Sequence, residues 1–194
     1  MRMHMVLGIC LVLAATAIGC STIKGMGEDI GTVGSYYNAN LILTKSNECL
    51  NTYDERNPIY TRPTFLPGPK IMGSRITDSI ICEGSVIEAQ EITNSIIGLR
   101  SQIGKGTVIR DSIIVGNHFY MPPENESQPI SKEFSIGENC VIEKSIIDEF
   151  VEIKNNVKLI NKNKLTQYDG DGIYIRQGII IIPSGTHLPN GFEI

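Results

Sequence analysis

Side chains suited to chemistry are few in this chain and lie far apart in the sequence. His118 could act as the general base of an acyl transfer, because imidazole titrates near neutral pH; the competing interpretation is a histidine on a surface loop. The cysteines show neither the close pairs of a zinc site nor the density of a disulfide framework, so most are expected to be small buried hydrophobes. They are Cys10, Cys20, Cys49, Cys82 and Cys140. The sequence therefore predicts no metal site, no cofactor and no catalytic residue in this chain.

Composition and charge limit which elements can position such residues. The chain has 194 residues, of which 41% are apolar and 20% charged, and this suits one domain with a small appendage. The formal net charge is −4 and the basic residues are scattered, so nucleic acid is not an expected partner. Aromatic residues make up 6% while isoleucine is abundant, and this bias favours strands.

An apolar repeat predicts the architecture. Isoleucine or leucine recurs at steps of five or six, which fits neither a helix nor an ordinary alternating strand. The positions are 71, 76, 81, 87, 92, 97, 103, 109, 114, 136, 142, 147, 153 and 159. Three such faces make one turn of a triangular coil. We expect coils that stack so that the isoleucine at each corner lies over the isoleucine of the coil below.

One phrase of the repeat indicates where the coil is interrupted. The phrase Ile-x-x-Ser-Ile-Ile occurs four times, at 76–81, 92–97, 109–114 and 142–147. The last step of 33 residues equals either two turns or one turn with an inserted loop. Residues 117–133 contain three prolines among polar residues, which favours a loop that protrudes from a corner. We also expect a helix at Tyr36–Leu43 that caps the open first coil.

The first residues resemble a bacterial lipoprotein signal. An apolar run from Met5 to Ile18 precedes Gly19 and Cys20, which would be the lipidated residue, and residues 20–30 are similar to the start of an entericidin-type lipoprotein. This implies an outer or inner membrane protein if the signal is processed. The alternative is a fused start in a cytoplasmic protein.

The repeat and its flanking segments resemble two known families. The hexapeptide phrases resemble the left-handed parallel β-helix, so the expected fold is mainly β, with a short N-terminal helix and a C-terminal strand segment. Residues 28–41 resemble the end of the catalytic domain of glucose-1-phosphate adenylyltransferase, and residues 58–70 resemble its linker into the β-helix. Similar phrases at 97–104, 146–148, 157–162 and 172–179 extend this likeness over residues 27–194. The resemblance implies the C-terminal part of that enzyme.

The same resemblance assigns roles to a few residues. Asp29 matches a metal ligand of the family, but its partner ligands and the nucleotide-binding part have no counterpart here, so we interpret it as a relic without a catalytic role. Arg62, Arg100 and Arg176 are possible effector contacts, or else arginines at solvated corners or subunit interfaces.

Two further positions argue against activation by anions. Plant and cyanobacterial members use lysines to hold anionic activators, and the expected lysines are Glu149 and Ser184 here. A carboxylate where an anion should bind repels it, so this form of activation is not expected.

These inferences define three segments and three candidate functions. The segments are a signal at 1–19, an entericidin-like stretch with the catalytic-domain relic and capping helix at 20–57, and the β-helix domain at 58–194. The first candidate is a non-catalytic oligomerisation or regulatory module, with itself or a complete synthase subunit as partner. The alternatives are a membrane-anchored lipoprotein that carries the β-helix as cargo and a hexapeptide acyltransferase.

Overall fold

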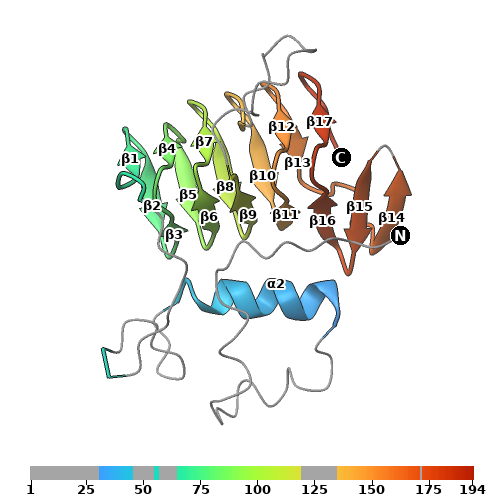
Figure 1. Ribbon diagram of the computed structural model, residues 1–194. Coiled ribbons are helices and arrows are strands. Elements are labelled where there is room, and N and C mark those ends of the chain that lie inside the picture. Colours follow the sequence, from blue (N-terminus) through green and yellow to red (C-terminus); the bar gives the residue numbers. More distant parts are fainter. Residues whose placement is uncertain (1–30, 46–54, 57–64, 119–134, 171) are drawn as a thin grey trace, which may run out of the picture.

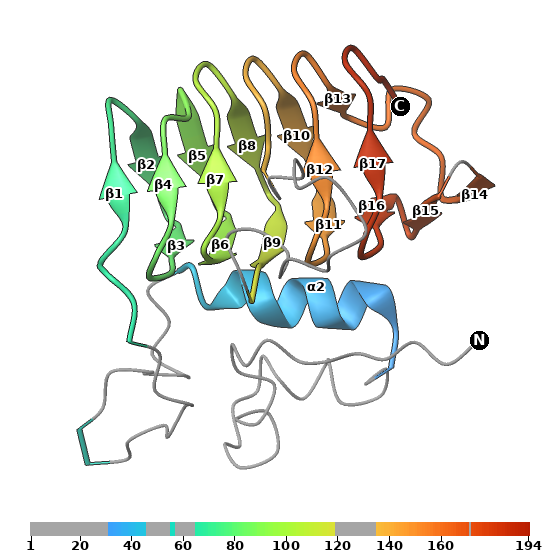
Figure 2. The same ribbon diagram turned by 45° about the horizontal axis from the view of Figure 1, so that its top comes forward.

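The computed structural model describes residues 31–45, 55–56, 65–118, 135–170 and 172–194. These residues form a triangular coil of short parallel strands with one helix beside it (Figures 1 and 2). The fold is a left-handed parallel β-helix; the repeat predicted the triangular coil, and the resemblance predicted its handedness.

The strands make three faces. The first face contains β1 (Lys70–Ile71), β4 (Val86–Ile87), β7 (Gln102–Ile103), β12 (Glu152–Ile153) and β17 (His187–Leu188), with Ile136 bridging β7 and β12. The second face contains β2 (Arg75–Thr77), β5 (Glu91–Thr93), β8 (Val108–Arg110), β10 (Val141–Glu143) and β13 (Lys158–Leu159). The third face contains β3 (Ile80–Ile81), β6 (Ile96–Leu99), β9 (Ile113–Gly116), β11 (Ser145–Ile147) and β16 (Ile179–Ile182), and continues into an antiparallel hairpin of β15 (Ile173–Arg176) and β14 (Gln167–Gly170).

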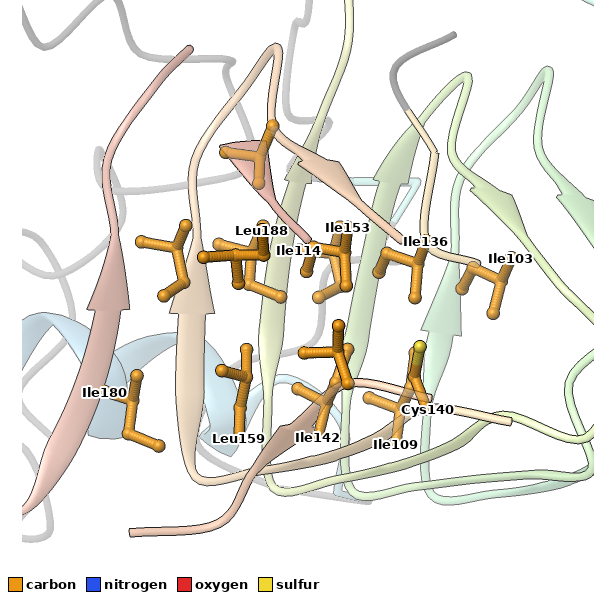
Figure 3. Close-up of a cluster of buried hydrophobic side chains, with 14 of the residues drawn as sticks. Ile103, Ile109, Ile114, Ile136, Cys140, Ile142, Ile153, Leu159, Ile180 and Leu188 are labelled. Carbon is orange, nitrogen blue, oxygen red and sulfur yellow. The ribbon is translucent and has the colours of Figure 1, made fainter. Parts of the chain in front are cut away.

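The apolar repeat forms three ladders of stacked inward side chains. On the second face the ladder is Ile76, Ile92, Ile109, Ile142 and Leu159, each paired with the next. Figure 3 shows such side chains packed in the interior, where Ile109, Ile142 and Ile153 are at most 1% exposed. The isoleucines lie on the faces, not at the corners as expected, because an inward strand position removes the whole side chain from water.

The 33-residue step is one turn with an inserted loop, as predicted. Ile142 pairs directly with Ile109, so the two phrases lie in neighbouring coils. The loop itself, residues 119–134, lies outside the described residues. The inserted residues therefore leave the register between β8 and β10 unchanged.

A ladder of serine hydroxyls explains the serine in each phrase. Each serine follows a corner residue with a positive φ, namely Asp78, Asn94, Asp111 or Lys144. The amide of Ser95 donates to Ser79 Oγ at 3.2 Å, that of Ser112 to Ser95 Oγ at 3.1 Å, and that of Ser145 to Ser112 Oγ at 3.2 Å. Each of these hydroxyls donates to the carbonyl two residues earlier. The hydroxyls thus satisfy buried backbone groups where the strands turn.

The helix α2 (Val33–Ile42) forms in the segment of the sequence where a helix is predicted, but its position in space differs from the prediction. Thr32 caps its N-terminus by accepting from the Ser35 amide at 3.2 Å. Its buried side chains Tyr37 and Leu41 pack on Ile113, Ile146 and Ile179, which point outward from the third face. The helix therefore runs along the side of the β-helix (Figure 2), and the expectation that it caps the first coil is wrong.

The doubled isoleucines explain the position of α2. Ten residues make a helix of about 15 Å, which is long enough to cross the two strand spacings, about 10 Å, between β9 and β16. In Ile113–Ile114 and Ile146–Ile147 the second residue enters the core and the first contacts the helix. Because the third face is apolar on both sides, a helix along it removes the outward isoleucines from water.

Candidate functional site

One corner of the β-helix brings together four residues that the sequence analysis singled out. Arg100, His118, Glu149 and Ser184 follow β6, β9, β11 and β16, which are successive strands of the third face. The Asn117 amide donates to the Leu99 carbonyl at 2.7 Å, and the Gly185 amide to the Glu149 carbonyl at 3.4 Å, so these turns stack one over another. We call the four residues the Arg100–Ser184 corner.

A histidine and a carboxylate pair at the centre of this corner. His118 Nε2 lies 3.1 Å from Glu149 Oε2, and the His118 ring lies 6.2 Å from the Phe150 ring. Burial raises the pKa of the Glu149 carboxyl; the charge of His118 opposes this rise and that of Asp148 adds to it. Arg100 Nη1 donates to the Asn117 carbonyl at 3.3 Å. The corner therefore places an imidazole beside a partly buried carboxyl.

The space beside this corner fits a water molecule. A cavity of about 20 Å³ is lined by Ser101, Gln102, Asn117, Ser135 and Asp148, together with apolar core side chains. Such a volume holds one water with several polar partners. This cavity is too small for an acyl donor, and neither His118 nor Glu149 lines it.

Two of the predicted effector arginines, Arg100 and Arg176, are not brought together. Arg176 lies on β15, four strands from β6, which corresponds to about 19 Å from the strand that precedes Arg100. Its Nη2 lies 2.6 Å from Asp169 Oδ1, its Nη1 donates to the Tyr168 carbonyl at 3.0 Å, and it lies over the Tyr174 ring. Arg62 lies outside the described residues. The geometry thus ties Arg176 into its own hairpin.

A second polar cluster lies on the first face and was missed by the sequence analysis. The Glu152 residue is 5% exposed, and its Oε2 lies 2.5 Å from His187 Nδ1 while Oε1 contacts Lys154 Nζ. Glu152 pairs with His187 in the same register as Ile153 with Leu188. The apolar ladder could have revealed the pair, because outward neighbours of stacked isoleucines also stack.

The second face carries a stripe of alternating charge along the coil. Glu91 lies between Arg75 at 3.8 Å and Arg110 at 3.0 Å, and Arg110 also contacts Glu143 at 3.0 Å. These two hydrogen-bonded carboxylates raise the pKa of Arg110. Because the partly exposed pairs are screened by water, each contributes little to stability.

The same alternation continues at the last coil. Glu193 contacts Lys158 Nζ at 2.7 Å and also Lys162 Nζ. These two ammonium groups lower the pKa of Glu193 to about 2. The whole stripe is polar, unlike the helix-covered third face.

The structure describes some of the remaining predicted sites and leaves others outside the described residues. Cys20 and Asp29 lie outside the described residues, so their roles stay predictions. Cys140 is buried, as expected of a small hydrophobe, and burial raises the pKa of its thiol; Cys82 is half-buried. Within the described ranges, no three metal-ligating side chains gather, and no helix has the length and apolar character to cross a membrane.

A comparison with protein families agrees with this geometry. Residues 64–192, more than half of the chain, match the family model of the GLGC left-handed parallel β-helix domain. The matched part begins just before β1 and ends after β17, so it spans all three faces. The chain therefore belongs to the GLGC left-handed β-helix family, the C-terminal β-helix module of the glucose-1-phosphate adenylyltransferase family.

Proposed function

We propose that this chain is a non-catalytic assembly module that associates through its β-helix, with another copy or with a complete adenylyltransferase subunit. The observation that carries the proposal is the outer edge of the first coil, which we call the head edge. β1, β2 and β3 each end their sheets there, so one side of each strand has no strand partner among the described residues. Phe65 is 98% exposed and Ile71 45% exposed beside it.

An unpaired strand edge with exposed apolar side chains favours pairing with another chain. The second and third faces, in contrast, are covered by groups of the chain itself. The helix α2 covers the third face, and ion pairs cover the second. Of these three described surfaces, the head edge is therefore the one that gains most from a partner.

The experiment is sedimentation velocity of the full chain over a hundredfold range of concentration, repeated with a complete adenylyltransferase subunit added. Association of the chain with itself or with the added subunit is the expected result. A chain that stays monomeric and sediments apart from the complete subunit would overturn the proposal.

The regulatory part of the proposal concerns the Arg100–Ser184 corner. The stacking of Glu149 and Ser184 in neighbouring coils supports a corner that has lost its affinity for anionic activators, because a carboxylate occupies the place of one expected lysine. We expect 3-phosphoglycerate to leave the melting temperature of the chain unchanged. The Glu149→Lys/Ser184→Lys variant, in contrast, should be stabilised by it. A melting shift in the parent chain that the Glu149→Lys/Ser184→Lys variant does not enlarge would contradict this reasoning.

A further inference from the structure

A buried carboxyl oxygen on the first face has no hydrogen bond. Glu152 is 5% exposed, and its Oε1 contacts Lys154 Nζ. Its Oε2 is buried and accepts no hydrogen bond from any described residue. A buried polar oxygen in this state is costly, because it has lost water and gained no donor in exchange. Such an atom calls for a partner from outside the chain.

A histidine nitrogen faces this oxygen. His187 on β17 pairs with Glu152 on β12, and the two strands lie side by side near the C-terminal end of the first face (Figure 2). Its Nδ1 lies 2.5 Å from Glu152 Oε2, but the two groups are not aligned as a hydrogen bond. The unprotonated nitrogen of an imidazole and a carboxylate oxygen both carry lone pairs, so their convergence favours a positive ion between them.

We propose that Glu152 Oε2 and His187 Nδ1 bind a divalent transition-metal ion such as Zn²⁺, with water molecules as the remaining ligands. One imidazole nitrogen and one carboxylate oxygen suit Zn²⁺, Co²⁺ or Ni²⁺, whereas Mg²⁺ and Ca²⁺ prefer oxygen ligands alone. Bonds of about 2.0–2.2 Å to a tetrahedral ion place two ligand atoms about 3.3 Å apart. The contact must therefore widen by roughly 0.8 Å, which the His187 side chain, 42% exposed, permits.

The register of the inward ladder holds the two ligands side by side. Glu152 and His187 each precede an inward residue, Ile153 or Leu188, that is at most 2% exposed. Because these inward side chains fix both strands, the outward neighbours stay one strand spacing apart, about 4.8 Å between backbones. An ion bound here joins the last two coils on the first face. It stabilises the folded chain, since the unfolded chain does not hold the two ligands together.

Lys154 distinguishes a metal site from a merely structural cluster. Its Nζ contacts the other oxygen of the same carboxyl, and its side chain is 52% exposed, so it can move into water when an ion binds. The ammonium group and a divalent cation repel each other. Lys154→Gln should therefore bind the ion roughly tenfold more tightly, although it removes a contact of the folded chain.

The test is isothermal titration calorimetry of the full chain with zinc chloride at about pH 7.5, where free imidazole is mostly neutral. We expect Zn²⁺ binding that Glu152→Gln and His187→Gln each weaken at least tenfold and that Lys154→Gln tightens. His118→Gln, a matched change at the histidine beside Glu149, should leave it unchanged. Magnesium chloride should give no binding, because the site contains a nitrogen ligand.

Nuclear magnetic resonance of the parent chain keeps the test decisive if a variant fails to fold. The sequence has three histidines, His4, His118 and His187, so their imidazole nitrogen signals can be resolved after ¹⁵N labelling. Zn²⁺ should shift the Nδ1 signal of His187. A His187 signal that Zn²⁺ leaves in place overturns the proposal, as do equal affinities of the parent, Glu152→Gln and His187→Gln. The proposed assembly is tested separately, since its sedimentation measurements are made without added metal.

Discussion

Tyr37 links the helix to the β-helix through one hydrogen bond that can be removed without changing the packing. Its hydroxyl donates to the Asp111 carbonyl at 2.5 Å, and the residue is 6% exposed. Tyr37→Phe keeps the ring against the third face and deletes the donor. We expect the free energy of unfolding at pH 7 to fall by about 1 kcal/mol, the net value of such a bond.

The same residue makes that difference depend on pH. Burial, assisted by Asp111, raises the pKa of the Tyr37 hydroxyl well above its usual value of 10.0. In the unfolded chain the hydroxyl ionises near pH 10, so the stability that its neutral form contributes is fully present below that pH and is lost above it. At pH 11 the loss is about 1.4 kcal/mol, which follows from one pH unit beyond the unfolded pKa.

Urea unfolding of the parent chain and Tyr37→Phe at pH 7, 9, 10 and 11 measures both effects. The parent should be the more stable of the two at pH 7 and should lose this advantage by pH 11, while Tyr37→Phe changes less over the same range. Two parallel pH profiles would refute the reasoning, because they would mean that Tyr37 ionises equally in both states.

Three further predictions concern the ladders and the N-terminus. Ser112→Ala removes an acceptor for the Ser145 amide and a donor to the Arg110 carbonyl and should lower the free energy of unfolding by about 1–3 kcal/mol, whereas Ser184→Ala at an exposed corner should change it by less than about 0.5 kcal/mol, both measured in urea. Ile142→Ala empties a fully buried ladder position and should cost about 2–5 kcal/mol, against about 0.5–1.5 kcal/mol for Ile142→Val; equal costs would contradict the stacking. A processed lipoprotein signal should yield a lipidated chain that starts at Cys20 in the membrane fraction, by intact mass, and an unmodified chain with Met1 retained would contradict it.

The ladders could be predicted from the sequence because their signal is local and repeated. Ile92, Ile109 and Ile142 each open a phrase of the pattern Ile-x-x-Ser-Ile-Ile, so the register of one coil on the next follows from these phrases. Three prolines within residues 117–133 separated an inserted loop from an extra turn, and the pairing of Ile142 with Ile109 confirms that choice.

The position of the helix and the composition of the corners could not be derived in the same way. Tyr37 and Leu41 lie more than 70 residues before the isoleucines they cover, and a helix with one apolar side fits either an end or a face. The doubled isoleucines indicated that the helix would lie on the third face, because a strand that is apolar on both sides must be covered on both sides. Contacts such as His118 with Glu149 and His187 with Glu152 depend on which residues share a corner or a face in neighbouring coils, which only the stacked structure shows.

The 33-residue step between Ile109 and Ile142 has a consequence for how such chains vary. A strand packs according to the face on which it lies, whatever the number of residues between it and the previous coil. Residues added at this corner therefore leave the contacts between stacked side chains in place. Face positions and corner positions are therefore expected to vary differently among related sequences. Face positions are restricted by the neighbours above and below, whereas corners can lengthen freely. Homologues of this chain should accordingly be aligned coil by coil, with their gaps placed at the corners.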